Sequence, residues 1–320
     1  MSFSVLIPQD IPESAKALLR KMGCEVKMGR GQTESDIIAD IADCDAVVTR
    51  TVPYTRAIFE AAKKLRIASR FGVGVDNIDI NAATELGIWV ANTPQANSAT
   101  VAEHTIALIL SLATDLVDSC AETRKGNFAY RNQVMGRDLG GKTLAIIGIG
   151  KIGSHLARIA SAGFGMNVIA YDPFISSNQV PDYITLTPNR EQAFRDADFV
   201  SLHLPLNDET RGCIGANEFS LMKKSSCLIN CSRGEVVNEQ ALIAALQSGE
   251  IAGAALDVFE KEPPEADNPL LSMKNVIVTP HDASFTHEAF DRMGEHMAQN
   301  INDVISGRNP TWPVNNPVRK

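Results

Sequence analysis

The stretch GKTLAIIGIGKIGSHLARIASAGFGMNVIAYDP, residues 141–173, predicts how the whole chain is organised. An apolar run at 144–147 is typical of a buried parallel strand, and a glycine turn, a helical pattern and a second apolar run at 168–171 follow it. Gly148, Gly150 and Gly153 have the spacing G-x-G-x-x-G. In this spacing the glycines permit a tight turn, close approach of the backbone to a pyrophosphate, and close packing of helix on strand.

Asp172 closes the second apolar run, about 20 residues after the glycines, where a ribose-binding acid is expected. A carboxylate here accepts hydrogen bonds from ribose hydroxyls and repels a 2′-phosphate, which favours NAD over NADP. Taken alone, the glycine spacing can mark an ordinary turn and the acid can be a solvated strand end. Together with the flanking strands and helix, they predict a dinucleotide-binding unit whose helix N-terminus faces the pyrophosphate.

The composition is that of an ordinary globular chain that is too long for one hydrophobic core. Its 320 residues suit two domains, and 44% hydrophobic with 21% charged residues is normal for a folded protein. The net charge is −8, and lysines and arginines form no block. These features argue against nucleic acid or an anionic membrane as a partner through bulk electrostatics.

Three features predict a cytoplasmic protein. The N-terminus, MSFSVLIPQD, has no basic region and its apolar run stops at Pro8, unlike a signal peptide. The longest apolar helical stretch, 105–113, is far shorter than the ~20 residues that span a bilayer. The six cysteines are scattered without a C-x-x-C pair, which favours reduced thiols over a disulfide framework or a zinc site.

The first hundred residues alternate apolar runs with helical patterns, which predicts a parallel sheet covered by helices on both faces. The expected strands are 5–7, 24–28, 46–49, 65–69 and 88–90, and the expected helices are 12–22, 33–42, 55–64 and 80–86. In the loop 70–77, Gly72 and Gly74 resemble a second dinucleotide turn, but Asn77 stands where the third glycine is needed. This loop is either a plain turn or a row of backbone N–H groups that can bind a small carboxylate.

A long helix is expected at 97–117, and it is apolar nearly all round, as buried helices are. His104 within it is interpreted as a structural histidine of the core. The polar segment 121–138 has no clear periodicity and is interpreted as a surface arm that packs on another subunit.

Polar residues follow the later strands where each strand ends. Strands are expected at 199–202, 227–230, 251–256 and 276–279, and the chain closes with a helix at 286–305. Because the carboxyl ends of parallel strands share one sheet edge, and that edge carries the ligand cleft in open sheets, these polar residues are candidates for one site.

Arg233, Glu262 and His281 are the strongest candidates for chemistry at this edge. A guanidinium binds a carboxylate bidentately and polarises a neighbouring carbonyl. A histidine transfers protons near neutral pH, and a carboxylate beside it orients the ring and favours the imidazolium. Taken singly, these residues could be a surface ion-pair partner, a solvated loop acid and a strand-end cap. Beside a nicotinamide, the three together suit reduction of a 2-keto acid.

Four motifs in order make the chain resemble the D-isomer-specific 2-hydroxyacid dehydrogenase family over nearly its full length. They are GKTLAIIGIGKIG, NCSRGEVVNEQALIAAL, GAALDVFEKEPP and TPHDAS, starting at residues 141, 230, 253 and 279. The resemblance implies two doubly wound α/β domains with parallel sheets. A Rossmann NAD-binding domain at 99–290 is inserted in a flavodoxin-like substrate-binding domain formed by 1–98 and 291–320. It also implies a homodimer joined through the NAD-binding domains.

The resemblance also assigns roles to residues that match the family's motifs. Arg233 would bind the carboxylate and carbonyl of a small 2-hydroxyacid or 2-keto acid, His281 would act as the acid and base, and Glu262 would pair with His281. The implied NAD contacts are Gly148, Gly150, Lys151, Ile152, Gly153, Asp172, His203, Leu204, Pro205, Cys231, Arg233, Asp257, His281 and Ser284. The implied substrate contacts are Arg50, Val73, Gly74 and Arg233, and no metal is implied.

Within the family, VVTRT, RFGVGVDNID and NTPQANSATVAEHT are most similar to phosphoglycerate dehydrogenases. The similarity makes Arg50 a candidate contact for a second anionic group, such as a phosphate. Two departures weaken a claim for 3-phosphoglycerate itself. The chain stops at Lys320, so the C-terminal regulatory domain of many such enzymes is not expected, and HDASF replaces the usual HLGAS or HIGAS, with Asp282 beside His281.

Two other functions compete with a D-2-hydroxyacid dehydrogenase. The family also includes NAD-sensing transcriptional corepressors, whose extra partner-binding segments have no counterpart in this sequence. A formate dehydrogenase of the same superfamily would carry glutamine where Glu262 stands. Among dehydrogenase substrates, hydroxypyruvate, glyoxylate, 3-phosphohydroxypyruvate and longer or sulfonated acids all remain open, as does the direction of the reaction.

Overall fold

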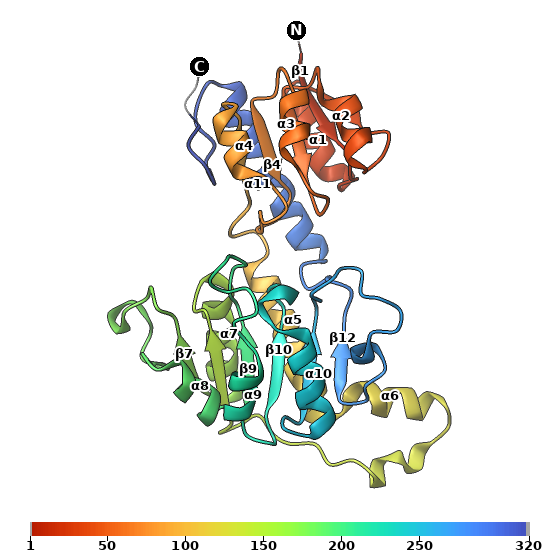
Figure 1. The fold of residues 1–320 in the computed structure, drawn as a ribbon, viewed down its shortest axis with the longest axis vertical. Coiled ribbons are helices and arrows are strands. Elements are labelled where there is room, and N and C mark those ends of the chain that lie inside the picture. The colour runs from red at the N-terminus through yellow and green to blue at the C-terminus, as the bar shows by residue number, and fades with distance from the viewer. Residues whose placement is uncertain (1, 318–320) are drawn as a thin grey trace. The chain divides into compact units, whose positions relative to one another are not determined.

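The computed structural model describes residues 2–317, and the chain divides into two compact units (Figure 1). One unit joins the two ends of the chain, Met1–Asn97 and Phe285–Lys320, and the other is the middle, Ser98–Ser284. Both are α/β units with an all-parallel sheet, as the sequence predicted. The divisions differ from the predicted boundaries by one residue at the first and six residues at the second.

The unit formed by the chain ends contains a five-stranded sheet in the order β2-β1-β3-β4-β5. This is the flavodoxin-like order. Alternate residues of each strand point to opposite faces, so Val5 and Ile7 pack under α1 and α11, while Leu6 packs under α2, α3 and α4. The strands are β1 (Phe3–Ile7), β2 (Cys24–Met28), β3 (Ala46–Thr49), β4 (Ile67–Arg70) and β5 (Trp89–Ala91). The helices are α1 (Glu13–Lys21), α2 (Glu34–Ile41), α3 (Arg56–Ala61), α4 (Ile80–Glu85) and α11 (His287–Ile305).

The middle unit contains a seven-stranded sheet in the order β12-β11-β10-β9-β6-β7-β8. Counted from β6, this is the Rossmann order 3-2-1-4-5-6 with one further strand, and the order reverses between β6 and β9. The strands are β6 (Thr143–Ile147), β7 (Asn167–Tyr171), β8 (Ile184–Leu186), β9 (Phe199–Leu202), β10 (Cys227–Asn230), β11 (Gly253–Leu256) and β12 (Val276–Val278).

Helices cover both faces of this second sheet (Figure 1). Leu144 and Ile146 pack toward α5 and α7, whereas Ala145 and Ile147 pack toward the opposite face with α8, α9 and α10. Burying one such aliphatic side chain stabilises the fold by about 1.5–3 kcal/mol, so the run at 144–147 anchors the glycine turn that follows it. The helices are α5 (Ser98–Thr114), α6 (Leu116–Arg124), α7 (Lys151–Phe164), α8 (Arg190–Asp196), α9 (Ala216–Leu221) and α10 (Glu239–Ser248), with 3₁₀ turns η1 (Phe128–Asn132), η2 (Ser177–Gln179), η3 (Gly234–Val236) and η4 (Pro269–Leu271).

The single helix expected at 97–117 is wrong, because Asp115 breaks it. Asp115 adopts a left-handed backbone with φ of 53°, a conformation that aspartate tolerates better than most residues. The chain therefore turns by 66° between α5 and α6, and α6 occupies part of the segment expected to lack regular structure. Among residues 2–317, no single helix is long and apolar enough to cross a membrane, and the bent pair α5–α6 passes that test only when its two helices are taken together.

Candidate active site

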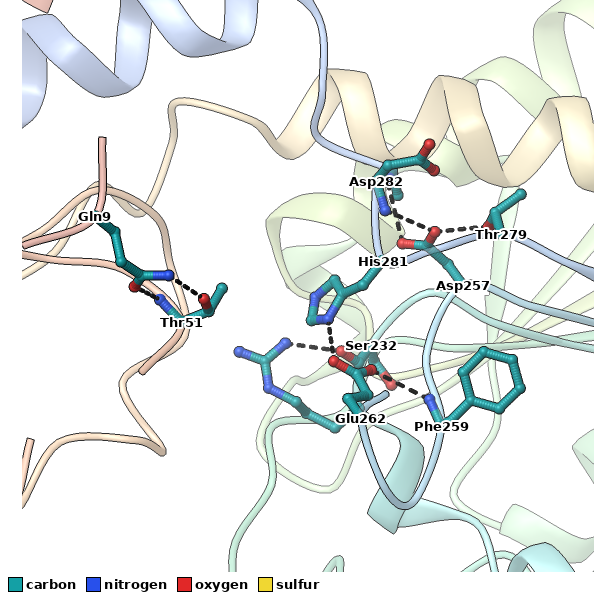
Figure 2. A network of polar contacts seen from close by, with 11 residues as sticks. Gln9, Thr51, Ser232, Asp257, Phe259, Glu262, Thr279, His281 and Asp282 are labelled. Atoms are coloured by element: carbon teal, nitrogen blue, oxygen red, sulfur yellow. Dashed lines mark hydrogen bonds and ion pairs between the residues drawn. The ribbon is translucent and has the colours of Figure 1, made fainter. Parts of the chain in front are cut away.

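The three residues predicted to carry chemistry follow three neighbouring parallel strands of the middle unit. Figure 2 shows two of them, Glu262 and His281. Arg233 follows β10, Glu262 follows β11 and His281 follows β12. Parallel pairing of β10 with β11 and of β11 with β12 places all three after the carboxyl ends of the strands. The three residues therefore lie at the same edge of one sheet, the edge at which the sequence predicted a site.

His281 and Glu262 form a direct pair. His281 Nδ1 lies 2.7 Å from Glu262 Oε2, and the N–H of Phe259 donates to Glu262 Oε1 at 3.2 Å. Partial burial on its own raises the pKa of Glu262, but the hydrogen bond and charge of His281, the Phe259 N–H and the charge of Arg233 outweigh it. The pKa of Glu262 is therefore below its ordinary value, which keeps this group a carboxylate beside the histidine.

Asp257 holds the turn that presents His281. Its side chain is fully buried at the end of β11, and its Oδ1 accepts from the Thr279 hydroxyl at 2.6 Å and from the N–H of Asp282 at 2.9 Å. Its Oδ2 accepts from the N–H of Ala283 at 3.0 Å. These bonds flank His281, whose backbone is left-handed with φ of 54°. Since a non-glycine residue with positive φ needs support from its surroundings, Asp257 positions the histidine.

Two features bring the Arg233 loop against the Glu262 loop. Buried Asn230 fixes the loop after β10, since its amide donates to Arg233 O at 2.8 Å and its Oδ1 accepts from the N–H of Ser232 at 3.0 Å. Gly234 then lies so close to Phe259 that a Cβ at this position would be 1.9 Å from the Phe259 carbonyl carbon. Only glycine permits this approach, and the charge of Arg233 reaches Glu262 as a result.

The glycine turn between β6 and α7 fits a dinucleotide pyrophosphate. A Cβ at Gly148 would lie 2.6 Å from His203 O, and one at Gly153 would lie 2.4 Å from Gly148 O, so both positions need glycine for packing. A Cβ at Gly150 would meet nothing within 4 Å, so the backbone there is open to a ligand. Gly150 is the N-cap of α7, and its open backbone and helix N-terminus are the groups that bind phosphate.

Asp172 points toward that turn from the end of β7. Its Oδ2 accepts from the N–H of Ile149 at 3.1 Å and its Oδ1 from the N–H of Phe174 at 3.0 Å. The carboxylate is therefore held beside the glycine motif, on the β7 side of the point where the strand order reverses. This is the position from which an acid can reach the ribose of a bound nucleotide.

The other predicted cofactor contacts surround the same edge. Lys151 and Ile152 open α7, His203, Leu204 and Pro205 follow β9, and Ser284 ends the middle unit. Cys231 follows β10 and is buried, which raises the pKa of its thiol to about 12 and makes it unreactive as a nucleophile. Burial lowers the pKa of His203 to about 4, so this imidazole is neutral, and its Nε2 lies 2.9 Å from the Ser201 hydroxyl.

His104 does not lie where the sequence predicted. Its side chain is 24% exposed rather than enclosed in the core. Its Nε2 lies 3.4 Å from the Thr279 hydroxyl and 3.9 Å from Asp257 Oδ1, so it faces the turn that carries His281. The apolar neighbours of His104 on α5 concealed this, since they suggested burial from the sequence alone.

The predicted substrate contacts Arg50, Val73 and Gly74 belong to the other unit, where they follow the carboxyl ends of β3 and β4. The Arg50 guanidinium donates to Asp10 O at 2.5 Å and its Cζ lies 6.0 Å from the centre of the Phe71 ring. Burial lowers the pKa of Arg50, with Asp10 opposing the change, although arginine stays protonated.

Two side-chain amides that the sequence did not reveal as functional fix the backbone at Arg50. Gln9 Oε1 accepts from the N–H groups of Thr51 at 2.8 Å and Val52 at 3.1 Å, and its Nε2 donates to the Thr51 hydroxyl at 2.8 Å (Figure 2). Asn77 Nδ2 donates to Arg50 O at 2.9 Å and to Val52 O at 2.6 Å. The loop that carries Arg50 is therefore clamped from both sides.

Comparison with known proteins adds independent evidence on the middle unit. Residues 106–283 match the family model described as D-isomer specific 2-hydroxyacid dehydrogenase, NAD binding domain. The chain belongs to this family. A D-3-phosphoglycerate dehydrogenase of Methanocaldococcus jannaschii is 42% identical over 98% of this chain and 59% of its own length. A glyoxylate reductase of Korarchaeum cryptofilum is 38% identical over 99% of this chain and 97% of its own length.

A solved member of the same fold is similar over the whole chain. It is the NADPH-dependent glyoxylate/hydroxypyruvate reductase of Sinorhizobium meliloti, in complex with NADP and malonate. The TM-score is 0.90 at 28% identity, covering 100% of this chain and 99% of that one. The chain spans about three fifths of the length of the phosphoglycerate dehydrogenases among its curated relatives. As a D-isomer specific 2-hydroxyacid dehydrogenase family member, it has an NAD(P)-binding domain at 106–283.

Proposed function

We propose that this protein is an NAD-dependent oxidoreductase that interconverts a small D-2-hydroxyacid and its 2-keto acid. The observation that carries the proposal is the 2.7 Å His281–Glu262 pair beside Arg233, at the sheet edge of a family-matched NAD-binding domain. A proton donor, its carboxylate partner and a carboxylate-binding guanidinium are the groups that reduction of a 2-keto acid requires of the protein.

Each residue has a distinct role in the proposed reaction. A bound nicotinamide coenzyme would supply or accept the hydride at C2 of the substrate. Arg233 binds the substrate carboxylate and polarises the carbonyl, while His281 donates a proton from Nε2 to the carbonyl oxygen. Glu262 holds the ring through Nδ1 and so leaves Nε2 as the nitrogen that donates. In the oxidative direction, His281 takes the proton back.

NAD is the proposed coenzyme because of Asp172. Its carboxylate is held at the end of β7 next to the glycine turn by two backbone N–H groups. A negative charge at this position repels the 2′-phosphate of NADP and accepts from the ribose hydroxyls of NAD. The Sinorhizobium meliloti reductase uses NADPH, so coenzyme preference varies among structures with this fold.

The proposed substrate is a small 2-keto acid of the hydroxypyruvate, glyoxylate or 3-phosphohydroxypyruvate type. Phosphoglycerate dehydrogenases and a glyoxylate reductase are both among the relatives. Arg50 is proposed to bind a second anionic group of the substrate. Its guanidinium is half-buried, and its hydrogen bond goes to a carbonyl rather than a carboxylate. Val73 and Gly74 would offer backbone to the substrate carboxylate.

A panel of 2-keto acids assayed with NADH tests the function. We expect NADH oxidation with at least one of glyoxylate, hydroxypyruvate and 3-phosphohydroxypyruvate. Arg50→Ala should lower kcat/KM for the phosphorylated acid at least tenfold more than for glyoxylate, because the mono-anion offers no second group to bind. Arg56→Ala is the matched control, since Arg56 is an exposed arginine of the same unit that pairs with Glu85. Failure of every acid, with NADH still bound, would favour the coenzyme-sensing alternative.

We further propose that the protein is a homodimer joined through its middle units, in the cytoplasm. Leu116, Val117, Phe128 and Met135 lie on or beside α6 and η1 and are 50% to 95% exposed. Large exposed side chains grouped in one short segment are typical of an interaction surface. Sedimentation equilibrium tests this, with Phe128→Asp and Met135→Asp expected to give monomers. The cytoplasmic location is supported by the cysteines, which are all free thiols.

A further inference from the structure

Asp282, which directly follows the proposed catalytic histidine, has a partly buried side chain. Its backbone N–H is bound to Asp257 Oδ1 at 2.9 Å, while its own Oδ1 is enclosed and has no hydrogen-bond donor among residues 2–317. Leaving a buried acceptor without a donor costs roughly 1–3 kcal/mol, more for a charged group. The usual HLGAS or HIGAS motif avoids this cost with an aliphatic residue, so the carboxylate in HDASF calls for an explanation.

Asp282 does not stand alone, because a second carboxylate and an imidazole lie next to it. Ligand atoms of Asp282, Asp257 and His104 all lie within 4.8 Å of one another. Asp257 takes its hydrogen bonds from uncharged donors, the Thr279 hydroxyl and two backbone N–H groups. His104 Nε2 lies 3.9 Å from Asp257 Oδ1. Two carboxylates therefore face a single imidazole in this cluster.

The cluster lies on the side of the sheet that takes the nicotinamide. Under the proposed function, Asp172 at β7 binds the adenosine ribose on one side of the strand-order reversal between β6 and β9. In a Rossmann domain the second nucleotide then lies on the other side, beyond the ends of β9 to β12. Asp257 ends β11 and Asp282 follows β12, so both carboxylates belong to the nicotinamide half.

We propose that Asp282 sets the charge at the nicotinamide end of the site, so that the protein binds oxidised NAD⁺ in preference to NADH more strongly than it would with an uncharged residue there. The physical basis is that the oxidised ring is a cation and the reduced ring is neutral. A fixed anion close by therefore stabilises one form and leaves the other unchanged. Because one oxygen of this carboxylate is enclosed, salt screens the interaction less than it would screen a fully exposed charge. The inference rests on the proposed use of NAD(H).

The test is coenzyme binding in the absence of substrate. Dissociation constants of NAD⁺ and NADH are measured by calorimetry and by NADH fluorescence for the full chain and for Asp282→Asn, which keeps the shape and removes the charge. We expect the ratio Kd(NAD⁺)/Kd(NADH) to rise about three- to tenfold, chiefly through weaker NAD⁺ binding. Asp282→Leu, which restores the usual side chain, should move the ratio the same way. Asp267→Asn removes a charge from the exposed loop after β11 and should leave the ratio unchanged.

If Asp282→Asn and Asp282→Leu, both folded by circular dichroism, weaken NAD⁺ and NADH equally, Asp282 only shapes the turn and the proposal is rejected. If neither ratio changes, the Asp282 carboxylate has no effect on the charge preference of the site and the proposal is also rejected. If the unaltered protein binds neither NAD⁺ nor NADH, the proposed function fails, and this result is distinct from a failure of the role given to Asp282.

Discussion

Glu262 Oε2 lies 2.7 Å from His281 Nδ1, although the two residues follow different strands and are 19 positions apart. Because Nδ1 is engaged by the carboxylate, Nε2 is the ring nitrogen left to meet a substrate oxygen. The N–H of Phe259 holds the second carboxylate oxygen, so Glu262 cannot turn away from the ring without losing that bond. The pair therefore presents one nitrogen in one orientation, which is what a positioned proton donor needs.

Removing the imidazole should lower turnover strongly and spare coenzyme binding. We expect His281→Ala to lower kcat roughly 10²–10⁴-fold, the range that a positioned acid or base contributes. The NADH dissociation constant should stay within about twofold, because the glycine turn and Asp172 are untouched. Steady-state kinetics with the best keto acid and NADH fluorescence measure the two effects. His287→Ala, at an exposed position opening α11, is the control. Full turnover in His281→Ala would exclude His281 as the proton donor.

The lowered pKa of Glu262 predicts a pH-dependent contribution to stability. The native carboxylate holds its proton less tightly than in the unfolded chain, where the ordinary value is 4.5. Its stabilising effect is therefore complete above that pH and is lost as the pH falls through the lower native value. Thermal unfolding of the protein and of Glu262→Gln from pH 7 to pH 3.5 tests this. We expect the native protein to have the higher Tm at pH 7 and the gap to close below about pH 4.5. A gap that widens on acidification would contradict the assignment.

His203 should make the free energy of unfolding depend on pH at higher pH values than Glu262 does. Burial lowers its pKa from 6.5 to about 4, so between these values the unfolded chain binds a proton that the native protein does not. The free energy of unfolding therefore falls as the pH drops through this window, by at most about 3 kcal/mol. Urea unfolding at pH 7 and pH 4.5 should show a smaller loss for His203→Asn than for the native protein. Equal losses in both would show that the imidazole is protonated in the folded state.

Much of the fold could be predicted because its signals are local. The run at 144–147, the glycine spacing and Asp172 lie within one βα unit, and the structure has strand, turn, helix and strand in that order. The edge that carries the candidate site was predictable because polar residues follow successive parallel strands, whose carboxyl ends lie at the same edge of the sheet. The break at Asp115 was not, because it depends on one residue adopting a left-handed backbone inside an apolar pattern.

The hydrogen bonds that hold the site residues in place could not be predicted, because they join loops that are distant in sequence. Asp257 was expected only as a coenzyme contact, yet its carboxylate fixes the turn around His281. The amides of Gln9 and Asn77 clamp Arg50 from loops 41 and 27 positions away along the chain, and neither has a sequence pattern that points to this role. Such contacts depend on tertiary distances that residue spacing does not encode.

Coenzyme choice should depend on Asp172. We expect NADPH to be used at least tenfold less efficiently than NADH, as kcat/KM, because the carboxylate repels a 2′-phosphate. Asp172→Ser should reduce that discrimination by weakening NADH and admitting NADPH. Asp182→Ser serves as the control, because Asp182 is an exposed acid of the same unit that precedes β8 and so lies away from the carboxyl ends of the strands. Equal efficiency of the two coenzymes with the native protein would exclude Asp172 as the discriminating group.

Two glycines of the G-x-G-x-x-G motif should respond differently to the same added methyl group. At Gly153 a Cβ would lie 2.4 Å from Gly148 O and 3.0 Å from Ile146 Cγ2, so Gly153→Ala must displace backbone and should cost more than about 2 kcal/mol of unfolding free energy. At Gly150 a Cβ meets no atom within 4 Å and the backbone is extended, so Gly150→Ala should be within about 0.5 kcal/mol of the native protein.

Coenzyme binding separates the two variants further. The methyl group that Gly150→Ala adds would lie where the backbone approaches the pyrophosphate. This substitution should therefore raise the NADH dissociation constant at least tenfold while the fold is kept. Urea unfolding and NADH fluorescence on the same preparations give both quantities. If Gly150→Ala binds NADH as tightly as the native protein, the phosphates do not lie on this turn, and the coenzyme must bind the middle unit at another position.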